Sequence, residues 1–334
     1  MLQLAIAYKG SRALHVATRL GIPDLLVGEP KSAEDLAPLV KTPVETLQRL
    51  LRALAAYDVV NETSDGRFTI GRLGACVRSG GSNAVRDLVL MFGHDDYWQT
   101  WGELGNCVST GDHAAKLLFG VDNPFARYSA DPEVGPVFNR GMVAMSAYIS
   151  PAVIEAYDFS KVSCVVDVAG GRGRLIADVL DAVPHLEGKL LDLPATRGGA
   201  EELLTATGVR ERCEIISGDM FADIPEGGDL YMMKTVLHDW DDEKSIAILS
   251  KCREAMSARP NARLLIVEQI LPERVTPGFD AQMHVLADLN MMVRTGGFER
   301  TEAAFSELLE KAGMELVQVI PTRSFFSLLE ARPV

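Results

Sequence analysis

Apolar residues recur at helical spacing through the N-terminal part of the chain, up to about residue 150. A first stripe is made of Leu14, Val16, Leu20, Ile22, Leu25 and Leu26, and the breaker cluster Gly28 to Pro30 follows it. A second stripe consists of Leu47, Leu50, Leu51 and Leu54. The pattern predicts a mainly helical N-terminal half.

Polar residues mark where two of these helices begin. Ser32 followed by Asp35 predicts one start. Thr42 predicts another as an N-cap residue, with Pro43 at the first helical position and Glu45 closing a capping box.

A short strand pair follows the predicted helices. Val59 to Glu62 and Arg67 to Ile70 flank the turn residues Ser64 to Gly66, which is a hairpin signal. Three helices followed by a hairpin is the order of a winged helix.

Winged helices often bind DNA, so we compared that function with dimerisation. The helix expected at the recognition position, residues 43–56, offers only Arg49 and Arg52 against Glu45 on a largely apolar surface. A DNA reader would show a basic face, whereas exposed apolar helices more often pack against another chain. The whole chain is also acidic, with a formal charge of −13 that repels a phosphate backbone. We therefore expect a dimerisation module and no nucleic-acid partner.

From about residue 160 the pattern changes to short apolar runs that alternate with amphipathic helices. The predicted strands are 164–168, 188–192, 213–216, 230–233 and 263–268. Alternation of this kind predicts a mostly parallel sheet with helices on both faces. A closing pair of strands, 314–320 and 325–331, is joined by a short turn at Pro321 and suggests an antiparallel edge.

Composition narrows the class of protein. The chain is 47% hydrophobic and 24% charged, which is typical of a globular protein. No apolar stretch approaches the ~18 residues of a membrane span, and no basic segment precedes the apolar N-terminus, so we expect neither a membrane helix nor a signal peptide. The cysteines have no metal-binding spacing and are odd in number, which favours reduced thiols in a cytoplasmic protein: Cys76, Cys107, Cys164, Cys213 and Cys252.

A glycine-rich turn ends the first predicted strand of the sheet, within Asp167 to Arg174. Glycines let the backbone approach a ligand closely, and the following helix N-terminus favours an acidic group. The spacing fits the nicotinamide fingerprint poorly, because Ile176 stands where Gly or Ala is expected. The turn also lacks the Lys-Ser/Thr pair of a phosphate loop.

Two carboxylates at neighbouring strand ends sharpen the prediction. Asp192 ends the second strand, where a carboxylate can accept both hydroxyls of a ribose. Asp219 follows the third strand beside Met220 and Phe221, which offers a carboxylate for an adenine amino group and an apolar surface for its ring. A ribose and adenine site without a pyrophosphate-binding loop points to S-adenosylmethionine. The alternative is that Asp167, Asp192 and Asp219 are three ordinary loop aspartates.

His238 follows the fourth predicted strand, beside the proposed cofactor. A lone histidine is usually structural, but Glu268 ends the next strand and Glu299 lies in a later Gly-Gly motif. A carboxylate bonded to one imidazole nitrogen fixes the tautomer and leaves the other nitrogen free to take a proton. No metal is required for that chemistry, and the carboxylates are dispersed rather than at ligand spacing.

These motifs together resemble the small-molecule O-methyltransferases, a family that includes caffeic acid and acetylserotonin O-methyltransferases and bacterial enzymes acting on polyketides and phenazines. The matching stretches are 138–142, 167–173, 192–194, 218–221, 237–240 and 296–301. The resemblance covers essentially the whole chain. It implies an α/β fold, a Rossmann-like class I methyltransferase sheet domain preceded by a winged-helix-like dimerisation domain.

The resemblance also implies roles for individual residues. His238 is expected to be the general base, flanked by Glu268 and Glu299. The expected contacts of S-adenosylmethionine are Ala169, Gly170, Gly171, Asp192, Leu193, Asp219, Met220, Phe221, Lys234 and Trp240. An apolar acceptor pocket is expected from Trp98, Trp101, Phe138, Met142, Met145, Asp239, Met291 and Met292, although several of these equally suit core packing.

One departure from the family pattern is visible at Ala169, where the family usually has glycine. Because alanine favours negative φ, we expect the turn to avoid a left-handed conformation there and cofactor binding to survive.

The expected organisation is a dimerisation domain over residues 1–90, a helical linker over 91–155 that contributes to the acceptor pocket, and a cofactor-binding catalytic domain over 156–334. The expected partners are a small aromatic hydroxylated substrate and a second copy of the chain. Two other functions stay open: a nicotinamide-dependent oxidoreductase, and a non-catalytic ligand sensor with a winged helix.

Overall fold

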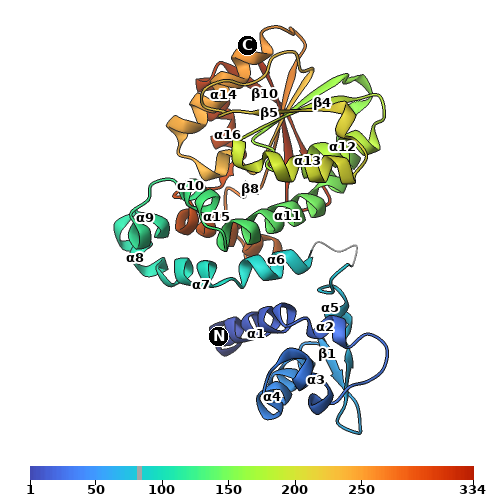
Figure 1. Ribbon diagram of the computed structural model, residues 1–334. Helices are drawn as coiled ribbons and strands as arrows, with labels where there is room; N and C mark the ends of the chain where they lie inside the picture. The colour runs from blue at the N-terminus through green and yellow to red at the C-terminus, as the bar shows by residue number, and fades with distance from the viewer. Residues whose placement is uncertain (81–84) are drawn as a thin grey trace. The chain divides into compact units, whose positions relative to one another are not determined.

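The computed structural model describes residues 1–80 and 85–334, and for Ser129 the backbone alone. It divides into two compact units (Figure 1). The first unit comprises Met1–Gln99 and Glu133–Tyr148, and the second comprises Thr100–Pro132 and Ile149–Val334. Each unit is described by itself.

The first unit begins with helices and an antiparallel hairpin, in the predicted order. The elements are α1 (Leu2–Arg19), α2 (Ile22–Leu25), α3 (Ala33–Val40), α4 (Val44–Ala55), β1 (Val60–Glu62), β2 (Phe68–Ile70), α5 (Arg72–Ala75) and α6 (Val85–Phe92). Both predicted leucine stripes contribute to one buried core, in which Leu26, Leu47, Leu51 and Phe68 are fully buried. The apolar spacing therefore predicted the local structure correctly.

The two predicted helix starts have different outcomes. Ser32 forms the capping box, since its Oγ accepts from Asp35 N at 3.2 Å and Asp35 Oδ2 accepts from Ser32 N at 2.8 Å. The prediction for Thr42 is wrong: α4 begins at Val44, with Pro43 as an N-cap that has no side-chain hydrogen bond. Thr42 lies in the tight connection after α3, and its hydroxyl donates backwards to Val40 O at 3.0 Å. It is therefore not placed to cap α4.

Helices α7 (Asp95–Gly102), α8 (Leu104–Thr110), α9 (Ala114–Phe119), α10 (Pro124–Ala130) and α11 (Val134–Ala156) lead to the sheet. In the part of the chain that the structure describes, no helix has both the length and the apolar character needed to cross a bilayer.

The second unit is built on a seven-stranded sheet of order β10-β11-β7-β6-β3-β4-β5. Its strands are β3 (Cys164–Val168), β4 (Glu187–Asp192), β5 (Cys213–Ser217), β6 (Leu230–Lys234), β7 (Arg263–Glu268), β10 (Met314–Pro321) and β11 (Ser327–Pro333). Strands β3 to β7 are parallel, and β11 pairs antiparallel with β7 and β10. The predicted parallel sheet and antiparallel edge are both confirmed.

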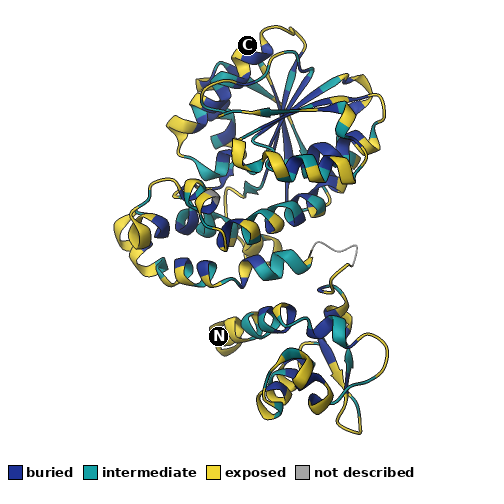
Figure 2. Cartoon of the chain, in the orientation of Figure 1, coloured by how far each residue is buried: buried dark blue, intermediate teal, exposed yellow. Residues whose placement is uncertain are grey.

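Helices cover the sheet, and the strands are mostly buried (Figure 2). The helices are α12 (Arg174–Ala182), α13 (Arg197–Ala206), α14 (Asp242–Met256), α15 (Phe279–Arg294) and α16 (Glu302–Lys311). Residues of α14 and α16 share one core with the central strands. A small parallel pair, β8 (Ile270–Leu271) and β9 (Arg300–Thr301), was not predicted from the sequence.

The strand order places the predicted site at a single edge of the sheet. The chain order reverses between β3 and β6, which are neighbours, and open sheets bind ligands at the carboxyl ends of strands at such a point. The glycine turn follows β3, and the segment that carries His238 follows β6.

Candidate active site

Two glycines of the turn after β3, Gly170 and Gly173, have no room for a side chain. A Cβ on Gly170 would lie 2.4 Å from Asp167 Oδ2 and 2.5 Å from a methyl group of Leu190. Gly173 has a φ of 77° and opens α12. Glycine at these two positions is therefore required by the close approach of the backbone and by its left-handed conformation.

Asp192 is bonded to this turn. Its Oδ2 accepts from Gly171 N at 2.7 Å and its Oδ1 accepts from Leu193 N at 2.8 Å. Burial raises the pKa of the Asp192 carboxyl, and these hydrogen bonds oppose the rise. Each carboxylate oxygen retains a second lone pair, so Asp192 can still accept hydroxyl groups of a ligand.

The conformation of Ala169 corrects the sequence analysis. Its φ is 55°, in the left-handed region that we expected the turn to avoid. An L-residue in this region costs roughly 1–2 kcal/mol, because its Cβ approaches the carbonyl oxygen. The turn keeps its conformation because Gly170 N bonds to Leu191 O at 3.3 Å and Gly173 N bonds to Gly170 O at 2.9 Å. The backbone on both sides of the turn thus outweighs the local preference of one alanine.

A glycine at position 169 is expected to stabilise the protein. The Ala169→Gly variant removes the left-handed strain, and the greater freedom of glycine in the unfolded chain offsets part of that gain. We expect the free energy of unfolding to rise by about 0.5–1 kcal/mol, measured by chemical denaturation. Ala182→Gly, at the exposed end of α12, is the matched control and is expected to lower it. A loss of stability in Ala169→Gly would contradict the strain assigned to this position.

Asp167 in β3 and Lys234 at the end of β6 are ionisable residues whose pKa values are shifted by burial. Asp167 Oδ2 is buried and has no hydrogen-bond partner. Burial raises the pKa of Asp167 to about 7, with the charge of Lys234 opposing the rise and that of Asp192 adding to it. Burial also lowers the pKa of Lys234, against the charges of Asp167, Glu268 and Asp239. Its Nζ donates to Thr235 Oγ1 at 2.8 Å.

An aromatic wall lies beside the third strand end. Phe221 and Trp240 make an edge-to-face contact with ring centroids 5.1 Å apart, and Phe125 lies 6.1 Å from Trp240. Asp219 is exposed, and its Oδ1 accepts from Phe221 N at 2.9 Å. Met220 packs against the same core as Phe221 and Trp240, while Leu193 is 41% exposed.

These features fit S-adenosylmethionine. Gly171 has open space where a side chain would stand, so a ligand can approach bare backbone there. Asp192 can accept ribose hydroxyls, and the unpaired oxygen of Asp167 is a buried polar atom at the same turn. Phe221 and Trp240 supply apolar surface for a flat ring. Which individual residues between Ala169 and Trp240 contact S-adenosylmethionine remains a prediction.

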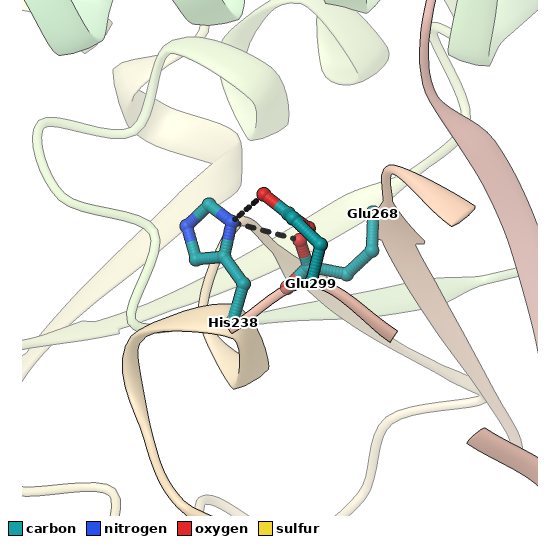
Figure 3. Close-up of side chains that lie close together, drawn as sticks. All are labelled: His238, Glu268 and Glu299. Atoms are coloured by element: carbon teal, nitrogen blue, oxygen red, sulfur yellow. Dashed lines mark hydrogen bonds and ion pairs between the residues drawn. The ribbon is translucent and has the colours of Figure 1, made fainter. Parts of the chain in front are cut away.

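His238 contacts two buried carboxylates, both on the Nδ1 side of its ring (Figure 3). It is carried by a short 3₁₀ helix, Leu237–Asp239, after β6, whereas Glu268 ends β7 and Glu299 immediately precedes β9. The imidazole Nδ1 lies 2.9 Å from Glu299 Oε1 and 3.4 Å from Glu268 Oε2. Nε2 is on the other side of the ring, 3.8 Å from Asp239 Oδ2. The three residues that the sequence analysis grouped are therefore in contact.

The charges around His238 change its acidity. Burial disfavours the imidazolium, but Glu268, Glu299 and Asp239 together outweigh burial and raise the pKa of His238 to about 10. Burial raises the pKa of Asp239 to about 7 and also raises that of Glu268. The ordinary imidazole pKa of ~6.5 therefore does not describe this histidine.

Glu268 also shapes the backbone before His238. Its Oε1 accepts from Val236 N at 2.9 Å and from Leu237 N at 3.0 Å, and its side chain is fully buried. The preceding residue, Thr235, has a φ of 53°, which is rare for a β-branched residue. Such strain persists only where the surroundings hold it, and it clusters at functional sites. The sequence offered no signal for Thr235.

The same cluster corrects the description of the carboxylates as dispersed. In the described part of the chain, one side-chain nitrogen or oxygen atom from each of His238, Glu268 and Glu299 lies within 4.8 Å of the other two, close enough to bind one metal ion. The carboxylates are thus dispersed in sequence but gathered in space. Glu299 Oε1 is hydrogen-bonded to Nδ1 of His238, and Glu268 Oε1 accepts from two backbone amides. The second oxygen of each glutamate, Oε2, has no hydrogen-bond partner.

The expected acceptor residues are divided between the two units. Trp98, Phe138, Met142 and Met145 belong to the first unit, and Trp101, Asp239, Met291 and Met292 belong to the second. In the second unit, Trp101 Nε1 donates to Asn290 Oδ1 at 3.0 Å. Trp101 and Met292 also border a small buried cluster with Cys107 and Val293, so both serve packing there. The acceptor pocket remains a prediction.

Comparisons with known proteins identify the family. Residues 101–315 match the model of the O-methyltransferase domain, and residues 2–77 match that of the O-methyltransferase dimerisation domain. A phenazine O-methyltransferase of Lysobacter antibioticus is 38% identical over 100% of this chain and 96% of the relative. The mitomycin biosynthesis 6-O-methyltransferase of Streptomyces lavendulae is 38% identical over 93% of this chain and 87% of the relative.

Solved structures agree with the sequence relatives. The human N-acetylserotonin methyltransferase in complex with S-adenosylmethionine superposes with a TM-score of 0.90 at 25% identity, covering 99% of this chain and 96% of that one. The predicted fold class, resemblance and cofactor are confirmed. The chain belongs to the S-adenosylmethionine-dependent O-methyltransferases and is an enzyme of that family.

Proposed function

We propose that this enzyme methylates a hydroxyl group of a small aromatic secondary metabolite, with His238 as the general base. The observation that carries the proposal is the imidazole whose Nδ1 contacts Glu299 Oε1 at 2.9 Å while Nε2 points away from both glutamates (Figure 3). An imidazole held at one nitrogen can take a proton at the other.

S-adenosylmethionine, when bound, supplies an electrophilic methyl group on a sulfonium cation. The chain's own residues must then orient the acceptor and remove its proton. A phenol has a pKa near ~10, like tyrosine. The carboxylates raise the pKa of His238 to about 10, so a proton shared between the two groups is held almost equally. Proton transfer to an imidazole of ordinary pKa would instead be uphill by roughly 3.5 units, or about 5 kcal/mol.

The same basicity means that His238 is an imidazolium at neutral pH before the acceptor binds. A phenol and a neutral imidazole hold as many protons as a phenolate and an imidazolium. One proton must therefore leave His238 or the acceptor when the reactive complex forms. We expect kcat/KM for the acceptor to rise with pH through the neutral range, toward the pKa of about 10.

Relatives named as a phenazine and a mitomycin O-methyltransferase support a fused or substituted aromatic acceptor. The direct test is incubation with S-adenosylmethionine labelled in its methyl group against a panel of phenols, naphthoates, phenazines and anthraquinones. Label is expected on the oxygen of at least one aromatic acceptor. Label only on nitrogen, or binding of a reduced nicotinamide in place of S-adenosylmethionine, would overturn the proposal.

We also propose that the chain is a homodimer through residues 1–90, with residues 91–155 contributing to the acceptor pocket and residues 156–334 forming the catalytic domain. The match to the dimerisation domain supports this. Light scattering at micromolar concentration should give twice the monomer mass of 36.3 kDa. A cytoplasmic location is proposed as well, since all five cysteines are unpaired.

A further inference from the structure

Arg300 bonds to the backbone on both sides of His238. Its Nη1 donates to Leu237 O at 2.9 Å, and its Nη2 donates to Trp240 O at 2.9 Å. The side chain is 1% exposed. These two carbonyls belong to the short helix and cap that present His238, so a single guanidinium spans the segment that carries the proposed base.

The guanidinium is itself held firmly. Its Nε and Nη2 donate to Asp242 Oδ1 at 3.1 and 2.9 Å, and Nη2 also lies 3.3 Å from Ser245 Oγ. The Phe298 ring lies 4.2 Å from its central carbon. The planar fork of arginine can donate to Leu237 O, Trp240 O and Asp242 Oδ1 at once, whereas a lysine ammonium is a single point charge. Arg300 is thus fixed on the segment rather than free to rotate.

The opposite edge of the same segment is bonded by Glu268, which accepts from Val236 N and Leu237 N. The residue before Arg300 is Glu299, which contacts the imidazole Nδ1 at 2.9 Å. One dipeptide therefore holds both the backbone and the ring of His238. Gly297 allows this approach, because a Cβ there would lie 2.0 Å from His238 O.

We propose that Arg300 is a positioning residue for methyl transfer: it holds the His238 segment so that the imidazole meets the acceptor hydroxyl. The proposal rests on the proposed function, in which His238 is the base. It also connects the base with the aromatic wall, because the carbonyl that Arg300 binds on its far side belongs to Trp240. A shift of about 1 Å at such a site can lower a rate by ~10²-fold.

The test replaces Arg300 with lysine, which keeps the positive charge and loses the fork. For folded Arg300→Lys we expect kcat to fall about 10- to 100-fold, while KM for S-adenosylmethionine stays within about 2-fold. The shape of the pH–rate profile is expected to remain, since the charge near His238 is kept. In Arg300→Ala, added methylguanidinium is expected to restore part of kcat.

Arg212→Lys is a matched control. Arg212 also donates to backbone carbonyls, to Leu180 O at 2.7 Å and Leu186 O at 3.0 Å, but it lies before β5, far from His238 in the sheet order. Its replacement should lower the melting temperature comparably and leave kcat per cofactor-binding site unchanged.

The outcomes separate the two proposals. If His238→Ala is impaired but folded Arg300→Lys has normal kcat, the positioning role is wrong and the proposed function stands. The positioning role is also wrong if the lower kcat of Arg300→Lys is fully explained by a smaller number of cofactor-binding sites. If His238→Ala is fully active, the role of His238 as general base in the proposed function is wrong, and the Arg300 proposal loses its premise.

Discussion

Replacing His238 with alanine is expected to lower the turnover number at pH 7 by roughly 100-fold or more, because the variant has no group to take the acceptor proton. Cofactor affinity is expected to change little, since the glycine turn, Asp192 and Asp219 are untouched. The measurements are steady-state kinetics with a validated acceptor and calorimetric titration with S-adenosylmethionine.

The stability of each variant must be measured as well, because the two glutamates that contact Nδ1 of His238 have side chains that are at most 1% exposed. Removing one partner of a buried charge pair typically destabilises a protein by about 3–5 kcal/mol. His238→Gln provides a second variant that retains a polar side chain at the cluster. Turnover is compared per cofactor-binding site, so unfolded protein does not count as catalytic loss.

Raising the pH is expected to rescue His238→Ala in part, because more acceptor is already ionised as the pH approaches its pKa of ~10. The alanine variant should therefore approach the wild type at alkaline pH and fall furthest behind at neutral pH. Near-normal turnover of the folded variant at pH 7 would mean that alignment alone drives methyl transfer, and the assignment of His238 would be wrong.

The fold was largely predictable because its elements obey short-range rules. Runs such as 164–168 and 263–268 are short and mostly apolar, which is typical of strands buried on both faces, and they form β3 and β7. Cap residues were less predictable. Thr42 has the right chemistry for an N-cap. It follows Lys41, the left-handed C-cap of α3, and its hydroxyl donates to Val40 O in place of capping α4.

The members of the site were predictable, and its electrostatics were not. His238, Glu268 and Glu299 could be grouped because they follow adjacent strand ends, but their distances set the acidity of the imidazole. Glu268 and Glu299, within 3.4 Å of Nδ1, together with Asp239 reverse the effect of burial on the pKa of His238. Arg300 was part of a recognised motif, yet its bonds to Leu237 O and Trp240 O, which suggest the proposed positioning role, are visible only in the structure.

Ala169 shows where a local rule failed. Its preference for negative φ is worth roughly 1–2 kcal/mol, yet the turn keeps φ at 55° because backbone hydrogen bonds of Gly170 and Gly173 hold it. The predicted acceptor residues could not be resolved for a different reason. Trp98 and Met291 lie in separate units, and helical spacing alone does not distinguish a pocket wall from a core.

Replacing Glu268 with glutamine is expected to move the pH–rate profile to lower pH. An amide oxygen can still accept from Val236 N and Leu237 N, so the backbone before His238 is retained. The negative charge 3.4 Å from Nδ1 is lost, and an opposite charge at this range typically shifts a pKa by about 1–3 units. Because that charge stabilises the imidazolium, its removal lowers the pKa of His238.

In the wild type, kcat/KM for the acceptor is expected to rise until the pH reaches the His238 pKa of about 10. In Glu268→Gln the rise should end at least roughly one unit lower. The charges of Glu299 and Asp239 still favour the imidazolium, so the shift is incomplete. The maximum rate is expected to fall less than in His238→Ala, since the imidazole can still accept a proton.

The profiles are compared with one acceptor, so that its own ionisation contributes equally to both enzymes. Glu310→Gln, on the exposed face of α16, is the matched control and should leave the profile where it is. A Glu268→Gln profile that coincides with the wild type would show that this carboxylate does not set the basicity of His238. A profile displaced to higher pH would reverse the sign of the interaction, because only a group that disfavours the imidazolium raises the pKa when it is removed.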